Sequence, residues 1–405
     1  MITPELIQET EGRFAERQVI REEREAKIES GAVLQADSPD RVRQRLQHLT
    51  NIAMETEGTS LAAPGQAQGP GVSVLERIMG KNDLISVRYL ELGLRVARTV
   101  GRIQSRLADG RQSYGTGFLV SPRLLLTNNH VLTDAGVAGA SRVEFDFQEG
   151  IDGKLQSSIF MDLDPAAFFV TDKSLDFSLV ALKGDLRKIS AYGWNGLSAA
   201  EGKIIVGEYV TIIQHPSGER KQIALRENQI VDVLDNFLHY KTDTSPGSSG
   251  SPVFNDQWEI VALHHSGVPQ KDSSGRILTR DGKVWNAAMG EHAINWAANE
   301  GVRISRILEH LQGLTLSGAQ AALRKQVLDG EHGWRGGDAS ARELAEVPGE
   351  AAAPVSPAEA AVNGQYAALP AEALSAAWRA LESYGGPPAA GVPAGEESAA
   401  EWLVR

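Results

Sequence analysis

The spacing of apolar and polar residues predicts helices over residues 1–95. From 4 to 30, sparse apolar residues are mixed with Glu and Arg, which is typical of an exposed helix. Ser38 begins a helix start signal, and apolar residues follow it at helical spacing at Val42, Leu46, Leu49 and Ile52. A linker rich in Gly, Ala, Pro and Gln over 58–71 separates this helix from a third helical pattern over 73–103.

After residue 104 the pattern changes to short β-rich runs of strand length, separated by turn residues. The runs are YGTGFLV, RLLLTNN, RVEFDF, AFFVTD, DFSLVAL, YVTIIQH, KQIALREN, NQIVDVL, FLHYKTD and WEIVALHH. Many short strands of this kind predict an all-β sandwich or barrel. The closing stretch over 292–311 predicts a strand that runs into an amphipathic helix, and one more helix is expected over 316–330.

The last part of the chain, 331–405, is dominated by Ala, Pro, Gly and Glu. Such a composition buries too little apolar surface to offset the entropy of folding, so we expect most of this tail to be disordered. The piece over 369–385 is expected to be a short helix or a binding peptide.

Composition narrows the function classes. Of the 405 residues, 42% are apolar and 23% charged, and the net charge of −12 gives no reason to expect a nucleic-acid or anionic-membrane partner. The absence of cysteine excludes disulfides, thiolate zinc sites and cysteine nucleophiles. The first residues have no apolar core like that of a signal peptide, and no apolar run reaches membrane-spanning length. We therefore expect a cytoplasmic location, with secretion by another route left open.

A glycine-flanked serine stands out near the end of the β-rich region, in the turn Gly247-Ser248-Ser249-Gly250-Ser251-Pro252. A lone serine hydroxyl is a weak nucleophile, so it needs a neighbouring base and a site for the negative charge that it creates. Glycine on both sides lets the backbone expose the hydroxyl and aim N–H groups at one point. Taken alone, the same turn is more typical of a simple hairpin than of an active site.

This stretch, GSSGSPVF followed by IVALHHSGVP, resembles the active-site segment of the chymotrypsin-like serine peptidases, most closely their bacterial, glutamyl-endopeptidase-like branch. The resemblance implies an all-β core of two six-stranded antiparallel β-barrels with a C-terminal helix. It implies a trypsin-like peptidase domain over 96–314, preceded by a helical region over 1–95. A helix and the mostly disordered tail would then occupy 315–405.

The resemblance extends to three catalytic positions in the family's order. His130 lies in TNNHV after an apolar run, Asp176 lies in SLDFSLV at the start of a buried strand, and Ser249 lies in GSSGSP. Alone, the histidine would be read as structural and the aspartate as a turn cap. Together, and with GTGFLV before them, they indicate a triad in which Asp176 orients His130, which takes the proton of Ser249.

The resemblance also implies an oxyanion hole formed by the backbone N–H groups of Gly247 and Ser249, with Pro246 a departure from the family pattern. A strand edge for the substrate backbone is expected at His265, Ser266 and Gly267.

The specificity pocket gives conflicting signals. Asp243 falls where trypsin has the aspartate at the floor of its pocket, whereas Thr244 and His264 fall where glutamyl endopeptidases bind a substrate carboxylate. The alternatives are a basic preference, an acidic preference, or an Asp243 that caps the loop outside the pocket.

We expect neither a metal nor another cofactor. Adjacent His264 and His265 on a strand face opposite ways, and no HExxH motif or phosphate-binding glycine loop is present. The expected function is a serine endopeptidase acting on protein or peptide substrates. The alternatives are a catalytically silent peptidase-fold module that binds peptides and, more weakly, an esterase or lipase, against which GSSGS and the order of the triad argue.

Regulation is expected to fall to the N-terminal helices, as a cover or as a docking arm for a regulatory protein partner. In trypsin-like zymogens an aspartate before the nucleophile pairs with a newly cut N-terminus. Here that position is the uncharged Ser248, so we expect the oxyanion loop to form without N-terminal processing.

Overall fold

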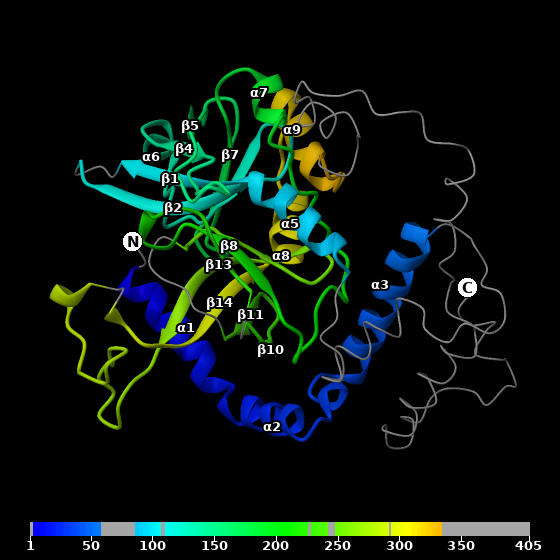
Figure 1. Ribbon diagram of the computed structural model, residues 1–405, viewed down its shortest axis with the longest axis vertical. Coiled ribbons are helices and arrows are strands. Elements are labelled where there is room, and N and C mark those ends of the chain that lie inside the picture. Colours follow the sequence, from blue (N-terminus) through cyan, green and yellow to red (C-terminus); the bar gives the residue numbers. More distant parts are fainter. Residues whose placement is uncertain are drawn as a thin grey trace, which may run out of the picture. The chain divides into compact units, whose positions relative to one another are not determined.

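Two antiparallel sheets of seven strands each form the core of the protein (Figure 1). The computed structural model describes residues 3–57, 86–106, 110–225, 228–241, 248–290 and 293–333. The chain divides into two units. One contains Met1–Glu23 and Ile85–Asp338, and holds both sheets; the other contains Arg24–Leu84 and Ala339–Arg405.

The first sheet is built from residues 100–181, and its strands follow the order β5-β4-β1-β2-β3-β7-β6. The strands are β1 (Val100–Arg106), β2 (Gln112–Leu119), β3 (Leu124–Thr127), β4 (Arg142–Phe145), β5 (Ile159–Asp162), β6 (Phe169–Asp172) and β7 (Phe177–Ala181). Beyond the ends of β5 and β7, Leu163 pairs with Leu182, so the edge strand β5 is bridged to β7, the strand next to the other edge.

The second sheet is built from residues 211–303, in the order β10-β11-β14-β13-β12-β8-β9. The strands are β8 (Thr211–Gln214), β9 (Gln222–Ala224), β10 (Ile230–Val233), β11 (Phe237–Tyr240), β12 (Pro252–Phe254), β13 (Ile260–Pro269) and β14 (Trp296–Arg303). Here a bridge between Tyr209, just before β8, and Gln229, just before β10, links the edge strand β10 to the strand next to the other edge.

Alternation along β3 and β7 explains how the two sheets pack together. Leu125 and Val180 belong to the core cluster inside the first sheet. Leu126 and Leu179 point the other way, into a cluster shared with β12, β13 and α8 (Ile304–Gly313). Both faces of these strands are buried, which accounts for their continuous apolar sequence.

The helices of the described residues lie at both ends of the sequence and in short connections. They are α1 (Pro4–Glu16), α2 (Gln18–Glu29), α3 (Pro39–Glu57), α5 (Arg88–Arg98), α6 (Ala135–Gly139), α7 (Leu186–Ser190), α8 and α9 (Gly318–Leu328), with 3₁₀ turns at Val33–Gln35, Pro216–Gly218 and Ala287–Met289. Within this part of the chain, no helix is both long and apolar enough to cross a bilayer.

The predicted all-β core in two halves, with a helix after its last strand, is confirmed, although each half has seven strands rather than six. Two helix predictions were wrong in detail. The third helical pattern ends at Arg98, because Val100–Arg106 pairs with both β2 and β4 as a strand. The helix expected over 4–30 is interrupted at Arg17, whose guanidinium binds the buried Asp232 on β10.

Candidate active site

His130 and Asp176 meet because the strands before and after them are neighbours. His130 follows the end of β3, and Asp176 directly precedes β7. These strands pair antiparallel, with Thr127 opposite Ser178. The end of one strand therefore lies beside the start of the other. The tight β6–β7 connection requires Asp176 to adopt a positive φ of 43°.

The carboxylate of Asp176 holds His130 at two points. Its Oδ2 accepts a hydrogen bond from Nδ1 of the ring at 2.7 Å, and its Oδ1 accepts one from the backbone N–H of His130 at 3.0 Å. The proton is thus on Nδ1, which leaves a lone pair on Nε2. That Nε2 is buried and has no hydrogen-bond partner among the described residues. An imidazole in this state is ready to accept a proton.

Ser249 belongs to the second sheet and contacts the first. It lies in the turn before β12, and its carbonyl accepts a hydrogen bond from the backbone N–H of Thr116 on β2 at 2.8 Å. The next residue, Gly250, donates its N–H to the carbonyl of His264 on β13 at 2.9 Å. The serine is therefore held between the two sheets. No hydrogen bond joins its hydroxyl to His130 in the described structure.

Gly250 is required by this close approach. Its φ is +88°, and a Cβ placed on it would lie 2.0 Å from the carbonyl oxygen of Thr116 and 2.4 Å from Oγ1 of Thr127. We expect Gly250→Ala to lower the free energy of unfolding by about 3 kcal/mol, since the backbone of Thr116 cannot move aside without disturbing β2. Chemical denaturation would measure the loss.

Gly275 provides the matched control for that variant. Its φ of +77° is similar, but nothing lies within 4 Å of its added Cβ. Gly275→Ala should cost only about 1 kcal/mol, which is the strain of a positive φ alone. Equal losses in the two variants would show that the contact with Thr116 is unimportant.

A second histidine also contacts Asp176. Nδ1 of His265 lies 3.2 Å from Oδ2 of Asp176, and its Nε2 lies 2.9 Å from Oε1 of Glu300 on β14. His265 is the extra residue of a β-bulge in β13, because the register shifts between His264 and Ser266. The bulge turns its ring inward, where it is 1% exposed.

The charges of this cluster are fixed by its contacts. Burial alone would lower the pKa of His265, but hydrogen bonds to Asp176 and Glu300, and their charges, raise it to about 9. Burial alone would raise the pKa of Asp176, but the charge and hydrogen bonds of His130 and His265 hold it below its ordinary value. The pKa of Glu300 likewise lies well below its ordinary value, because hydrogen bonds from His239, His265 and Arg13 outweigh burial.

His265 should contribute stability that is lost as pH rises through the neutral range. With its pKa raised from 6.5 to about 9, folded His265 keeps a proton that the unfolded chain releases above pH 6.5. This group alone contributes a slope of up to about −1.4 kcal/mol per pH unit between pH 7.5 and 8.5. Other buried groups act in the opposite sense, since burial lowers the pKa of His264 to about 3 and that of Lys203 and Lys221 to about 8. Denaturant unfolding of the wild type and of His265→Gln at a series of pH values isolates the contribution of His265: the difference in free energy of unfolding between the two should fall between pH 7 and 9.

His264, predicted to line the specificity pocket, is 3% exposed on β13. Its Nδ1 lies 2.8 Å from the hydroxyl of Tyr240. Burial, followed by the charges of His265 and His130, lowers the pKa of His264 to about 3, so this ring is neutral at pH 7. Because the ring is neutral, it offers no direct charge attraction to an acidic side chain of a substrate.

The strand edge expected at His265, Ser266 and Gly267 has one open side. β12 pairs with β13 only from Ile260 to Leu263, whereas β14 pairs with β13 from Ala262 to Pro269 on the other side. The backbone beyond His264 therefore has no strand partner on the side of Ser249, among the residues described. The side chain of His265 does not face this edge but contacts two carboxylates.

Three predicted site residues, Asp243, Thr244 and Gly247, lie outside the described residues, as does Pro246. Ser249 is described, so its backbone N–H is the one member of the expected oxyanion hole that is placed. No group of three or more His, Asp or Glu side chains with metal-binding geometry occurs in the described part of the chain.

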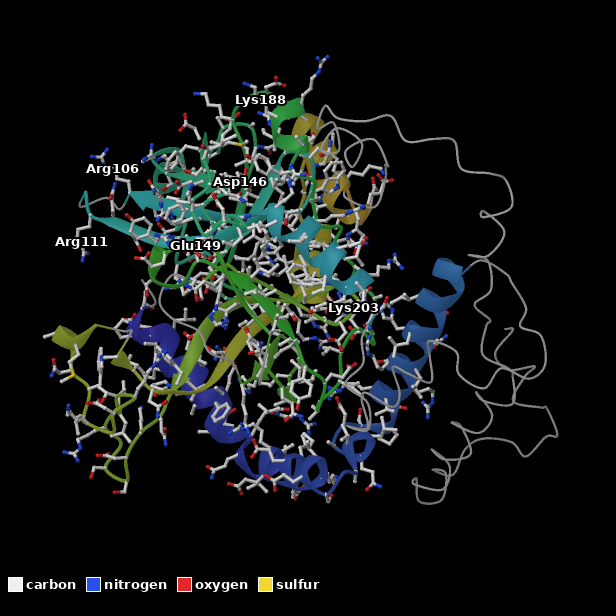
Figure 2. All side chains as sticks on the ribbon, viewed as in Figure 1. Arg106, Arg111, Asp146, Glu149, Lys188 and Lys203 are labelled. Carbon is white, nitrogen blue, oxygen red and sulfur yellow. The ribbon has the colours of Figure 1, made fainter. Side chains whose placement is uncertain are left out.

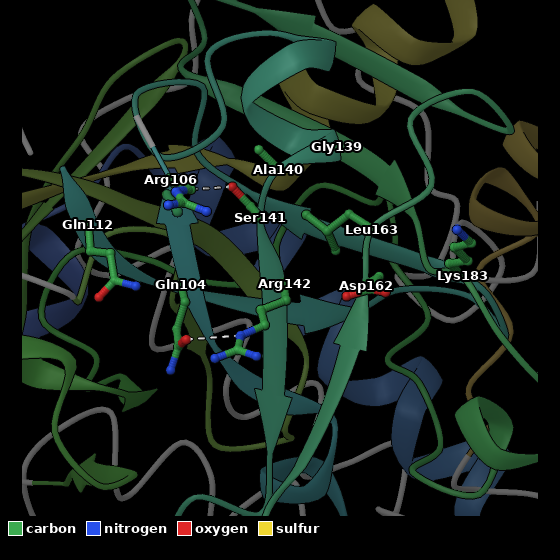
Figure 3. A pocket seen from close by; sticks show the side chains of 11 residues that line it. Gln104, Arg106, Gln112, Gly139, Ala140, Ser141, Arg142, Asp162, Leu163 and Lys183 are labelled. Carbon is green, nitrogen blue, oxygen red and sulfur yellow. Dashed lines mark hydrogen bonds between the residues drawn. The ribbon is translucent and has the colours of Figure 1, made fainter. Parts of the chain in front are cut away.

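A polar hollow of about 450 Å³ lies elsewhere, along β1, β4 and β5 (Figure 3). None of the predicted site residues lines it. Figure 2 shows Arg106 and Arg111 at the tip of the β1–β2 hairpin, pointing away from both sheets. We assign this hollow no part in the chemistry.

Comparison with known proteins finds one family match and several similar proteins. Residues 115–263 match the family described as trypsin-like peptidase domain. An uncharacterized protein, y4fB, of Sinorhizobium fredii is 40% identical over 267 residues, covering 60% of this chain and 40% of that protein. A glutamyl endopeptidase of Staphylococcus epidermidis is 23% identical over 175 residues, covering 41% of this chain and 58% of that protein.

The chain thus spans between 40% and 58% of the length of these two relatives. Among solved structures, the HtrA-type protease AlgW with a tripeptide is 17% identical and covers 55% of this chain and 62% of that one, with a TM-score of 0.35.

Proposed function

We propose that this chain, whose residues 115–263 form a trypsin-like peptidase domain, is a serine endopeptidase that cleaves peptide bonds through an acyl-enzyme. Ser249 is the nucleophile, His130 the general base and Asp176 the group that orients it. The observation that carries the proposal is the two-point contact of Asp176 with His130, which leaves Nε2 buried and without a hydrogen-bond partner among the described residues.

The proposed reaction follows the chemistry of these groups. Nε2 of His130 takes the hydroxyl proton as Ser249 attacks the substrate carbonyl, and Asp176 stabilises the imidazolium that forms. His130 then gives the proton to the leaving amine. The backbone N–H groups of Ser249 and Gly247 stabilise the negative charge on the carbonyl oxygen. A water molecule, deprotonated by His130, then attacks the carbonyl of the acyl-enzyme. The second product leaves as the acid, and the proton returns from His130 to the oxygen of Ser249.

The proposal is tested by labelling with a fluorophosphonate. This probe phosphonylates a serine only where a base activates it, so wild-type protein should react at Ser249, identified by mass spectrometry of the labelled peptide. A catalytically silent module that only binds peptides should not react. Labelling at a serine other than Ser249, or none at all, would overturn the proposal.

Cleavage is proposed to follow a charged residue, with basic residues favoured over acidic ones. A buried carboxylate at Asp243 would need a cationic partner, and neutral His264 offers no charge to an acidic one. A peptide library should therefore show cleavage after Arg or Lys, which Asp243→Ser depresses selectively by about tenfold or more. Cleavage after Glu that is lost in His264→Ala and unaffected in Asp243→Ser would favour the glutamyl type instead.

A further inference from the structure

The first helix of the chain is connected to the proposed catalytic pair by buried charged groups. α1 packs against β13 (Figure 1), and Arg13 on this helix binds Glu300 through two nitrogens. The distances are 3.0 Å from Nε to Oε2 and 2.6 Å from Nη2 to Oε1. Thr10, one turn earlier, donates its hydroxyl to the same Oε1 at 3.1 Å.

Glu300 links Arg13 to the proposed active site through a second hydrogen bond. Its carboxylate is fully buried, and it also accepts a hydrogen bond from Nε2 of His265 at 2.9 Å. The other ring nitrogen of His265 contacts Asp176, which orients His130. An unbroken series of hydrogen bonds thus runs from Arg13 through Glu300 and His265 to Asp176.

Charge balance makes each member depend on the others. Asp176 and Glu300 are anionic, while His265 and Arg13 are cationic, so these four buried or half-buried groups are neutral together. Removal of Arg13 leaves an excess negative charge in a region without water to solvate it. One of these groups then has to change its protonation state or its position. Because Asp176 belongs to the cluster, its hold on His130 changes as well.

We propose that α1 is a built-in activating element, and that Arg13, Glu300 and His265 are positioning residues which hold Asp176, and through it His130, in the active arrangement. This inference rests on the proposed function. It gives the N-terminal helix a different role from a removable cover. Because coupling is reciprocal, any event that lifts α1 from the second sheet lowers activity, and occupation of the active site favours the docked helix.

Arg17, the residue that caps the C-terminal end of α1, provides a matched control. Its guanidinium binds the buried carboxylate of Asp232 on β10 at 2.5 and 2.9 Å, so it anchors α1 to the same sheet with similar geometry. Asp232 is not a member of the series that runs from Arg13 through Glu300 and His265 to Asp176. Arg17→Gln therefore removes an anchor of similar geometry while Arg13 still holds α1 on the sheet, and it removes no charge from that series.

The experiment compares full-length Arg13→Gln, Arg13→Lys and Arg17→Gln with the wild type. The readouts are the rate of fluorophosphonate labelling at Ser249, kcat and KM on one peptide, and the pH profile of kcat/KM. Arg13→Gln should lower kcat and the labelling rate by about tenfold to a hundredfold, with KM changed little. Arg17→Gln should stay within about twofold of the wild type, and Arg13→Lys should recover part of the loss.

The pH profile separates positioning from simple anchoring. The titratable and charged groups around His130 and His265 are Asp176 before β7, Glu300 on β14, His239 on β11, His264 on β13 itself and Arg13 on α1. Loss of the Arg13 cation makes the cluster around Asp176 more negative, so the acid limb of kcat/KM should move to higher pH in Arg13→Gln alone.

Equal losses in Arg13→Gln and Arg17→Gln, or no loss in either, would overturn the inference. Absence of labelling in the wild type would instead overturn the proposed function. The coupling would then be judged by the imidazole NMR signals of His265, which should move in Arg13→Gln and stay in place in Arg17→Gln.

Discussion

Replacement of Ser249 by alanine is expected to lower kcat for peptide hydrolysis by about a millionfold while the fold stays intact. The turn that carries Ser249 is held by backbone hydrogen bonds from Thr116 and to His264, and neither involves the hydroxyl. Removal of one oxygen therefore takes away the nucleophile and leaves the turn in place. His130→Ala should be comparably damaging, because a serine and its base act as one unit.

Ser251 is the matched control for the nucleophile. It lies two residues later in the same turn, is equally buried, and its hydroxyl has no hydrogen-bond partner among the described residues. Ser251→Ala removes the same atoms and should keep activity within about threefold of the wild type. Turnover of a fluorogenic peptide measures both variants. If Ser249→Ala retained more than a few per cent of activity, the nucleophile would be misassigned.

The parts of this site that sequence could predict are those encoded by local patterns. LLLT is a strand buried on both faces, and DFSLVA is its neighbour, so the ends of these two segments had to carry His130 and Asp176. GSSG is a turn with a required glycine, and Gly250 indeed has no room for a side chain. Each of these signals lies within a few residues of the feature that it predicts.

Glu300 and Arg13 could not be predicted in the same way. Glu300 lies in NEGVR, which has no motif, and its partners Arg13 and His265 are far away in sequence. Arg13 is one of several basic residues in a charge-rich helix that was expected to be exposed. Only the packing of α1 on β13 distinguishes it from the others. The one local signal for Glu300 is that a glutamate stands in a strand whose middle residues are buried.

His265 shows why strand alternation can mislead. Adjacent His264 and His265 were expected to face opposite ways, with His265 at the substrate edge. The bulge between His264 and Ser266 places an extra residue in β13, so both rings are buried. A bulge depends on the partner strand β14 as much as on β13, and the sequence of one strand does not reveal it.

Asp176→Asn is expected to lower kcat/KM by about ten-thousandfold at pH 7 without unfolding the protein. Three N–H groups point at the carboxylate, from Nδ1 of His130, the backbone of His130 and Nδ1 of His265. An amide offers one acceptor oxygen and places an NH₂ group against at least one of these donors. The imidazole of His130 then favours the tautomer with its proton on Nε2, where it can no longer accept the proton of Ser249.

Asp172 is the control for this change. It begins the same β6–β7 connection, and its Oδ1 accepts hydrogen bonds from Oγ of Ser174 at 2.6 Å and from the backbone of Leu175 at 2.7 Å. Asp172→Asn keeps an acceptor for these donors and does not touch His130, so it should keep activity within about threefold of the wild type. The labelling rate at Ser249 measures both variants. Equal losses would mean that the shape of the connection matters rather than the acceptor at His130, and a fully active Asp176→Asn would remove Asp176 from the proposed mechanism.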